Sequence, residues 1–247
     1  MELLILSLIF TVSLGVSFLA HMIGGGGALV TVPMFIFLGL PANAAVATHK
    51  FGALGGAASA LYNFKRAGKI EYRYVIPVTL ISIIGSYIGA RILIDVDEQL
   101  LSKTVAIILL MILPFIFVKN LGLKRKTVSR KRMMIGYICV FALTIYGGFF
   151  GGGVGILNMF VFIFLFGLTY VESNATIKIP WAVSLLVALV VLALHGLIHI
   201  IYGLVMLVGT LIGGYLGSNF AIKKGERFVR VAFSVFVVIS AIKLLFF

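Results

Sequence analysis

The stretch from Leu3 to Leu40 is almost wholly apolar and carries no Asp, Glu, Lys or Arg. As one straight helix it would measure about 57 Å, whereas the hydrocarbon core of a bilayer is about 30 Å thick. The chain must therefore turn back within this stretch. Four consecutive glycines, Gly24 to Gly27, predict the turn, because glycine is a weak helix former and adopts backbone angles that other residues avoid.

Similar apolar runs recur as far as Phe247, and no polar stretch is long enough for a separate soluble domain. Hydrophobic residues make up 62% of the 247 residues and charged residues 11%, whereas soluble domains carry about 25% charged residues. The single cysteine, Cys139, provides neither a disulfide nor a thiolate metal site. We therefore expect one all-α integral membrane domain over residues 1–247, with the first apolar run retained as a membrane element.

The two halves of the chain align without a gap when the sequence is shifted so that Gly24 falls on Gly152. The same shift places Gly25 and Gly27 on Gly153 and Gly155, Ala47-Thr48-x-Lys50 on Ala175-Thr176-x-Lys178, Tyr74 on Tyr202, Gly85 and Gly89 on Gly213 and Gly217, and Glu98 on Glu226. Lysine on lysine and tyrosine on tyrosine weigh more than glycine matches in apolar sequence. The alignment predicts a duplication, with repeat one at 1–119, a basic linker at 119–132 and repeat two at 133–247.

Each repeat is predicted to contain five apolar segments. They lie near 3–22, 27–40, 44–63, 74–94 and 101–118 in repeat one, and near 133–150, 155–168, 174–194, 199–220 and 229–246 in repeat two. A second glycine break, Gly151 to Gly155, matches the first. The first two segments of each repeat form either two short crossings or a glycine-broken re-entrant hairpin, followed by three transmembrane helices. The chain then has ten segments, or eight full crossings plus two hairpins.

The basic residues gather in three clusters between apolar runs, which is the pattern of cytoplasmic loops. The clusters are Lys65, Arg66, Lys69 and Arg73; the residues of the 119–132 linker; and Lys223, Lys224, Arg227 and Arg230. The loop around Asp95, Asp97 and Glu98 is acidic, and the loop around His195 and His199 has no Lys or Arg. This predicts a multi-pass protein of the cytoplasmic membrane with both termini outside and inverted repeats. The net charge of +13 thus reports orientation, and no basic face with a stacking platform suggests a nucleic-acid partner.

The glycine breaks are candidate anion-binding elements, because inverted repeats with broken helices place a substrate near the bilayer midplane. Residues after each break, Ala28 and Ile156, would begin short helices whose free N–H groups and positive dipole ends favour an anion. The candidate residues are Gly24, Gly25, Gly26, Gly27, Gly152, Gly153 and Gly155. The structural alternative is that these glycines only allow helices to pack closely.

Lys50 and Lys178 occupy the same position in the two repeats, each inside an apolar segment. A lysine within the membrane costs at least about 2.5 kcal/mol and indicates a functional site. We expect the two ammonium groups to face one cavity and bind a small divalent or carboxylate-like anion. Neutral hydrogen-bonding partners are expected from Thr48, Thr176, Asn43 and Asn174. The alternative is that each lysine extends to a membrane interface.

The two repeats differ at positions that can carry coupling to protons. His49 precedes Lys50 where Ile177 precedes Lys178, and Glu172 stands where the first repeat has Ala44. Histidine and glutamate beside a membrane cavity can relay protons, although Glu172 lies at a segment end where solvent also reaches it.

Other motifs are expected to be structural. His195 and His199 are four positions apart but lack the glutamate of a zinc motif and a third ligand, so we expect no metal and no cofactor. The Gly85/Gly89 and Gly213/Gly217 pairs predict close-packing faces, within the chain or in a homodimer. No nucleophile elbow, phosphate-binding loop or haem motif suggests catalytic residues.

The glycine-rich breaks and the G-L-x-x-x-x-A-x-A-T-x-K stretch at Gly39 to Lys50, with its echo at Gly167 to Lys178, resemble the TauE/SafE family of sulfite exporters. The resemblance covers nearly the whole chain and implies movement of sulfite, sulfonates or related anions. The sequence then predicts a secondary transporter that alternates access to a central site between the repeats. The alternatives are a passive anion channel and, from another class, a membrane-embedded hydrolase or metalloenzyme that uses His49, His195, His199 and Glu172.

Overall fold

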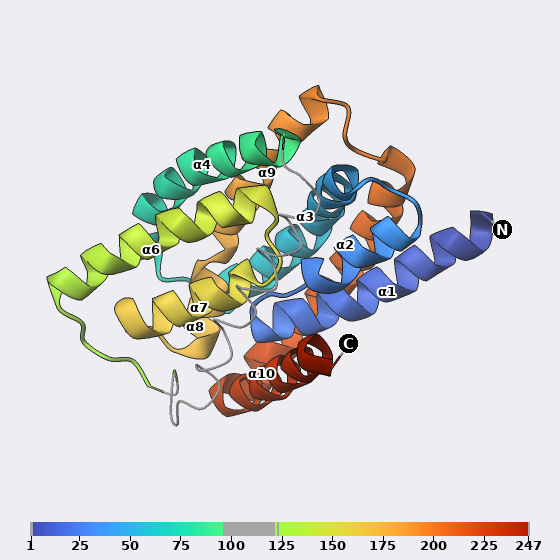
Figure 1. Ribbon diagram of the computed structural model, residues 1–247. Helices are drawn as coiled ribbons and strands as arrows, with labels where there is room; N and C mark the ends of the chain where they lie inside the picture. The colour runs from blue at the N-terminus through green and yellow to red at the C-terminus, as the bar shows by residue number, and fades with distance from the viewer. Residues whose placement is uncertain (1, 96–121, 123, 247) are drawn as a thin grey trace.

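The structure is a computed structural model that describes residues 2–95, 122 and 124–246, and all regular secondary structure in this part of the chain is helical (Figure 1). The helices are α1 (Glu2–Ile23), α2 (Ala28–Phe37), α3 (Ala42–Arg66), α4 (Tyr72–Asp95), α6 (Arg130–Phe149), α7 (Val154–Leu165), α8 (Tyr170–Thr176), α9 (Lys178–Leu194) and α10 (Ile200–Phe246). Gly225 interrupts α10 with φ 74° and ψ −172°, so two helical runs follow one another there. The predicted segment 101–118 and the acidic residues Asp97 and Glu98 lie outside the described residues.

Five described spans are long and apolar enough to cross a membrane: Glu2–Ile23, Tyr72–Ile94, Arg130–Phe149, Tyr170–Leu194 and Ile200–Gly225. Helices α2 and α7 are much shorter, with 10 and 12 residues. At 1.5 Å per residue they measure about 15 and 18 Å, roughly half of a bilayer core. They are therefore too short to cross the membrane as straight helices. Short helices of this kind are what the re-entrant hairpin form of the prediction requires.

The glycine breaks end α1 and α6 where the sequence predicts, and they turn the chain back. Gly24 and Gly26 in the first break, and Gly151 and Gly153 in the second, have positive φ angles between 76° and 106°, which favour glycine. Figure 1 shows the α1–α2 hairpin entering from the end that carries the N-terminus and the α6–α7 hairpin from the opposite end. The two tips thus approach each other inside the protein.

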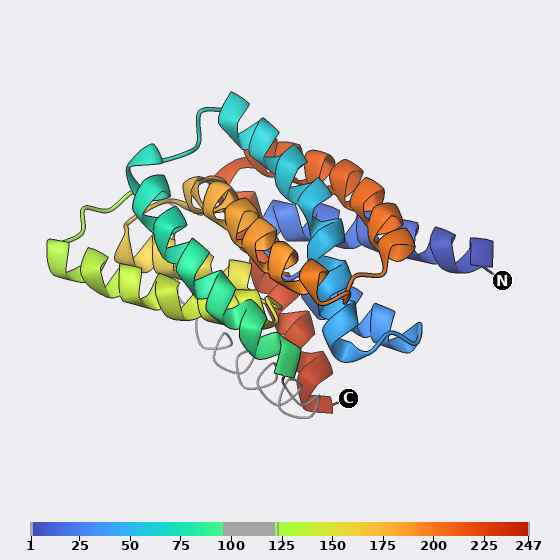
Figure 2. The same cartoon turned by 90° about the horizontal axis from the view of Figure 1, so that it is seen from above.

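The helix that contains the fourth predicted segment of each half, α4 or α10, packs against the other half. Helix α10 packs along α1 and α3, and α4 packs along α6 and α9 (Figure 2). Helices α1, α2, α3 and α10 therefore form one group, which we call bundle one, and α4, α6, α7, α8 and α9 form bundle two. The glycine-patterned faces make this exchange possible: Gly89 of α4 lies against the backbone of Ile145, and Gly217 of α10 against that of Phe18. Both faces are thus used for packing within the chain.

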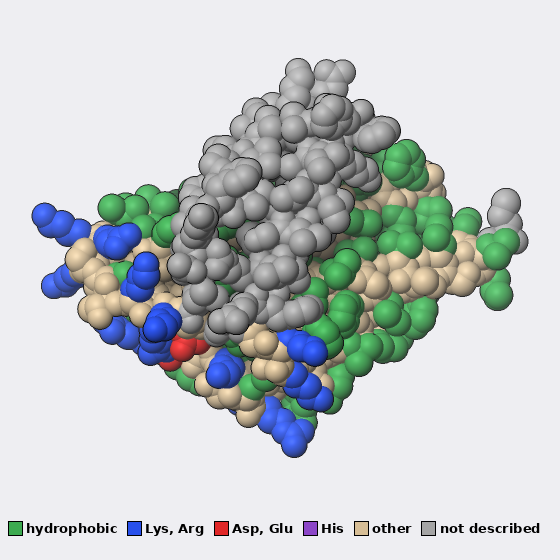
Figure 3. All heavy atoms as spheres, turned by 90° about the horizontal axis from the view of Figure 1, so that it is seen from below, with side chains coloured by type: hydrophobic (Ala, Val, Ile, Leu, Met, Phe, Trp, Pro, Cys, Tyr) green, Lys and Arg blue, Asp and Glu red, His purple; other side chains and the backbone are tan. Residues whose placement is uncertain are grey.

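The surface of the molecule divides into an apolar belt and a basic edge. Large exposed hydrophobic side chains lie on the outer helices, among them Ile76, Ile138, Val190 and Ile201. The lysines and arginines of the three predicted basic clusters are exposed from Lys65 to Arg73, from Lys124 to Arg132, and at Lys223 and Lys224. In Figure 3 the Lys and Arg side chains gather along one edge of the molecule, away from the chain's N-terminal end.

Candidate functional site

A cavity lies between bundle one and bundle two, and both predicted lysines line it. Its walls come from α1, α3 and α10 on one side, from α6, α7 and α9 on the other, and from the two glycine breaks. The cavity measures about 70 Å³, whereas a single water needs about 10–15 Å³. It therefore has room for a small anion with a few waters.

Lys50 extends from the middle of α3 towards the glycine break of the other half. Its side chain is 2% exposed, and its Nζ donates a hydrogen bond to the carbonyl oxygen of Gly147 at 2.6 Å. Gly147 lies in the last turn of α6, where unpaired carbonyl groups and the negative end of the helix dipole favour a cation. Lys50 therefore links the two bundles at the cavity wall.

Lys178 is the first residue of α9 and is 3% exposed. Its Nζ lies 5.4 Å from the ring centroid of Trp181, one turn further along the helix, within the range of a cation–π contact. Trp181 is the only tryptophan in the chain and also lines the cavity. Its ring lies 5.7 Å from that of His21 in α1, so Lys178, Trp181 and His21 lie next to one another where the two bundles meet.

Neither cavity lysine has a carboxylate partner among the described residues. The two ion pairs in that part of the chain both belong to Arg125, at the edge of the molecule. Both ammonium groups are enclosed by protein rather than extended to the membrane surface. Burying a charge without a partner of opposite sign is costly. The site therefore favours a negatively charged ligand.

The predicted glycines divide into two sets. Gly24 to Gly27 and Gly155 line the cavity, whereas Gly152 and Gly153 belong to the second break without lining it. The tips touch through their backbones, since a Cβ on Gly25 would lie 2.7 Å from the Cα of Gly155. Helix α2 begins at Ala28 as predicted, but α7 begins at Val154 and not at Ile156. The N–H of Ile156, which was expected to be free, donates to the carbonyl oxygen of Gly153 at 3.0 Å.

The predicted neutral partners do not line the cavity. Thr48 Oγ1 accepts a hydrogen bond from the N–H of His199, and Thr176 Oγ1 accepts one from the N–H of Glu71, each at 3.0 Å. Asn174 Nδ2 donates to the carbonyl oxygen of His21 at 2.9 Å. Asn43 Oδ1 accepts from the N–H of Ala44 at 2.8 Å, in the first turn of α3. These side chains hold backbone segments in place around the site.

Of the two predicted coupling residues, His49 and Glu172, only His49 lines the cavity. His49 lines the cavity, and its Nδ1 lies 2.6 Å from Thr31 Oγ1. The Thr31 hydroxyl also lies 3.1 Å from the carbonyl oxygen of Gly27, which can only accept. Because that carbonyl oxygen accepts the hydroxyl hydrogen, the Nδ1–H of His49 donates to the Thr31 oxygen. His49 is thereby linked to the first glycine break.

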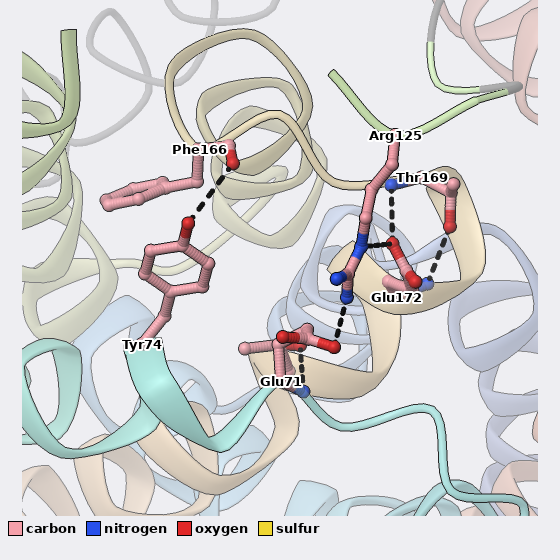
Figure 4. Close-up of polar contacts among 7 residues, drawn as sticks. Glu71, Tyr74, Arg125, Phe166, Thr169 and Glu172 are labelled. Atoms are coloured by element: carbon pink, nitrogen blue, oxygen red, sulfur yellow. Dashed lines mark hydrogen bonds and ion pairs between the residues drawn. The ribbon is translucent and has the colours of Figure 1, made fainter. Parts of the chain in front are cut away.

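Glu172 lies outside the cavity, at the edge where the linker meets α8 and the start of α4 (Figure 4). It forms a capping box with Thr169 at the start of α8. Arg125 of the linker pairs with Glu172 at 3.2 Å and also with Glu71, the residue that precedes α4. Hydrogen bonds that Arg125 donates to Glu172 and Glu71 raise the pKa of its guanidinium above the usual value. This cluster joins the linker to the start of α4, from the first half of the chain, and to α8, from the second half.

Three of the cavity residues that were not predicted from the sequence carry a polar or aromatic side chain with a signal in the sequence. His21 and Asn158 line the cavity from α1 and α7, and Trp181 lines it from α9. A signal for each exists in the sequence, since His21 is the only ionisable side chain between Leu3 and Leu40, Asn158 is a polar residue in an apolar segment, and Trp181 is the single tryptophan. Neither polar residue is matched in the other repeat, so the duplication did not point to them.

The histidines outside the cavity take part in local contacts. His195 Nδ1 lies 2.8 Å from the carbonyl oxygen of Val191, and the His199 ring stacks on Tyr202 with centroids 4.0 Å apart. Among the described residues, no three metal-ligating side chains gather in a group.

Comparison with known proteins identifies the relatives of this chain. The family model described as sulfite exporter TauE/SafE matches residues 9–244. A probable membrane transporter protein of Haemophilus influenzae is 29% identical over 227 residues, covering 92% of this chain and 89% of the relative. The probable membrane transporter protein YfcA of Escherichia coli K12 is 30% identical over 249 residues, covering 98% and 90%. No solved structure matches. The chain thus belongs to the TauE/SafE sulfite exporter family, whose members are membrane transporters and not enzymes.

Proposed function

We propose that the protein is a secondary transporter that moves a small anion, such as sulfite or a sulfonate, across the cytoplasmic membrane. The observation that carries this proposal is the pair of enclosed lysines, Lys50 and Lys178, which line one cavity without a carboxylate partner among the described residues. An anion in the cavity supplies the missing negative charge, and the two ammonium groups replace part of its hydration shell.

The proposed inverted repeats are supported by hydrogen bonds that recur at the offset that aligns the two halves. Thr48 binds the N–H of His199, and the residues at the equivalent positions, Thr176 and Glu71, make the same bond with the halves exchanged. The positive-φ glycines Gly39 and Gly68 likewise have counterparts at Gly167 and Gly196. Such paired contacts are expected of two repeats related by a pseudo-two-fold axis.

The proposed orientation places the basic edge in the cytoplasm and both termini outside. The clustering of exposed Lys and Arg side chains along one edge supports it, since cytoplasmic loops are rich in these residues. The N-terminus lies at the opposite end of the molecule.

The exchanged helices refine the proposed movement. Because α4 and α10 pack mainly against the other half, the two bodies that rock are bundle one and bundle two rather than the two repeats. The chain passes between bundles in the α3–α4 and α9–α10 connections, which contain the positive-φ residues Gly68 and Gly196. Rocking about these connections exposes the cavity to each side of the membrane in turn.

The test is uptake of labelled sulfite and of a small sulfonate into proteoliposomes, with Lys50→Ala and Lys178→Ala compared with the wild type. Lys131→Ala is the matched control, since Lys131 is an exposed lysine of the basic edge. We expect saturable uptake in the wild type and the control, and its loss in both cavity variants with folding retained. Uptake that survives both cavity substitutions would remove the lysines from the mechanism, and flux that never saturates would indicate a channel.

A further inference from the structure

Two polar side chains that line the cavity each keep a buried atom without a hydrogen-bond partner. His21, near the end of α1, is 4% exposed, and its Nε2 has no partner among the described residues. Asn158, in α7, is 6% exposed, and its Oδ1 has none in the same part of the chain. One residue comes from each hairpin, and both residues line the cavity. Buried polar atoms in proteins normally have a hydrogen-bond partner. A ligand bound in the cavity could provide the missing partner for these two atoms.

The contacts of His21 determine whether its Nε2 donates or accepts a hydrogen bond. Nδ1 lies 2.9 Å from the carbonyl oxygen of Ser17, and a carbonyl oxygen only accepts, so Nδ1 carries a hydrogen. In the neutral ring, Nε2 then presents a lone pair and accepts. A neutral ring also avoids a third positive charge in a cavity that already holds Lys50 and Lys178.

The ring of His21 is held in place from several sides. It packs over Gly56 of α3, where a Cβ would lie 3.0 Å from Nε2, and beside the Trp181 ring. The Ser17 hydroxyl lies 3.2 Å from Nδ1. Its hydrogen is donated to the carbonyl oxygen of Thr210 in α10 at 2.8 Å. The acceptor therefore lies on a well-packed part of bundle one, beside Trp181 and Lys178 of bundle two.

We propose that the cavity selects an anion that carries its own hydrogen-bond donor, such as a hydroxyl, an amino group or an acid proton. The ammonium groups bind the anionic group, and His21 Nε2 accepts from the donor. The Asn158 amide, whose oxygen and nitrogen can exchange places by rotation, provides a second polar contact. This inference rests on the proposed anion site and adds a specificity-determining residue to it.

The test uses the single tryptophan as a reporter, because Trp181 lies in the site and no other tryptophan contributes to the fluorescence. The full-length protein in lipid nanodiscs is titrated with isethionate and with propane-1-sulfonate, which have the same charge and nearly the same size. They differ in a terminal hydroxyl against a methyl group. We expect wild-type protein to bind isethionate about tenfold more tightly or better, because a site built to hydrogen-bond a hydroxyl rejects an analogue without it.

Three variants assign the preference to His21. His21→Asn keeps a donor near the Ser17 carbonyl but removes the acceptor at the Nε2 position, and should lose the preference while still binding both anions. His21→Gln carries an oxygen that reaches the Nε2 position, and should retain part of the preference. His195→Gln, at an exposed histidine outside the cavity, should match the wild type.

The remaining outcomes distinguish failure of the donor proposal from failure of the anion site. Equal affinities of the wild type for the two sulfonates would overturn the donor proposal and leave the anion site intact. An equal loss of affinity for both sulfonates in His21→Asn would also overturn it, since His21 would then act on the anion as a whole. No saturable fluorescence change with either sulfonate would contradict the anion site itself, and the donor proposal with it.

Discussion

Thr48 in α3 accepts a hydrogen bond from the backbone N–H of His199, which lies in the other half of the chain, at 3.0 Å. Its counterpart Thr176 does the same for Glu71. Each threonine thus receives the N–H of the residue just before the exchanged helix, and these two bonds hold the crossing connections against the site.

Replacing either threonine by valine should destabilise the protein by about 1–3 kcal/mol, because a backbone N–H at a packed position loses its acceptor. Thr48 and Thr176 are both fully buried, so water does not readily replace the hydroxyl. The measurement is the free energy of unfolding in detergent for Thr48→Val and Thr176→Val. Thr127→Val, at an exposed threonine, serves as the control. A change in only one of the two buried variants would argue against equivalent roles.

Gly25→Ala and Gly155→Ala should separate the hairpin tips and abolish uptake, because a Cβ at either position would lie within 3.0 Å of the other tip's backbone. Overpacking of this kind also costs about 1–3 kcal/mol of stability. Gly15→Ala in α1 is the matched control, since a Cβ there meets nothing within 4 Å. The control should gain up to about 1 kcal/mol from the higher helix propensity of alanine. Normal uptake by the tip variants would show that close contact of the tips is dispensable.

Lys178→Met should raise the thermal stability of the empty protein and remove its response to anions. The substitution keeps an unbranched side chain of similar length and eliminates a buried charge that has no carboxylate partner among the described residues. In the wild type, sulfite at a hundredfold excess over its dissociation constant should add about 2.7 kcal/mol. Thermal unfolding with and without sulfite measures both effects. A variant that is less stable than the wild type when empty would contradict the electrostatic account.

Arg125→Gln should weaken the contact of the linker with α8 and the start of α4 at the basic edge, because Arg125 pairs with both Glu71 and Glu172. Its side chain is 51% exposed, so the expected loss of stability is only about 1 kcal/mol or less, and it should shrink as salt is added. Unfolding measured at low and high ionic strength checks this, with Lys124→Gln as the control. A loss that does not depend on salt would indicate a packing role for the arginine stem.

Features set by local composition were predicted well. The apolar runs required membrane helices, and the glycine breaks required the chain to turn near Gly24 and Gly151, because no other residue type accepts those backbone angles so readily. Lys50 and Lys178 stood out because a charge within an apolar segment is costly wherever the chain folds, and both are found at the cavity.

Features that depend on which segments meet were decided by the tertiary structure. Thr48 and Thr176 looked like ligands of an anion, but an N–H from the other half uses their hydroxyl groups. His21 became part of the site only because the end of α1 lies beside α9, which belongs to the other half of the chain. Hydrophobic periodicity records which residues are apolar and not which helix covers them. The exchange of α4 and α10 between the halves therefore follows from close packing at Gly89 and Gly217, which the sequence indicates without naming the partner.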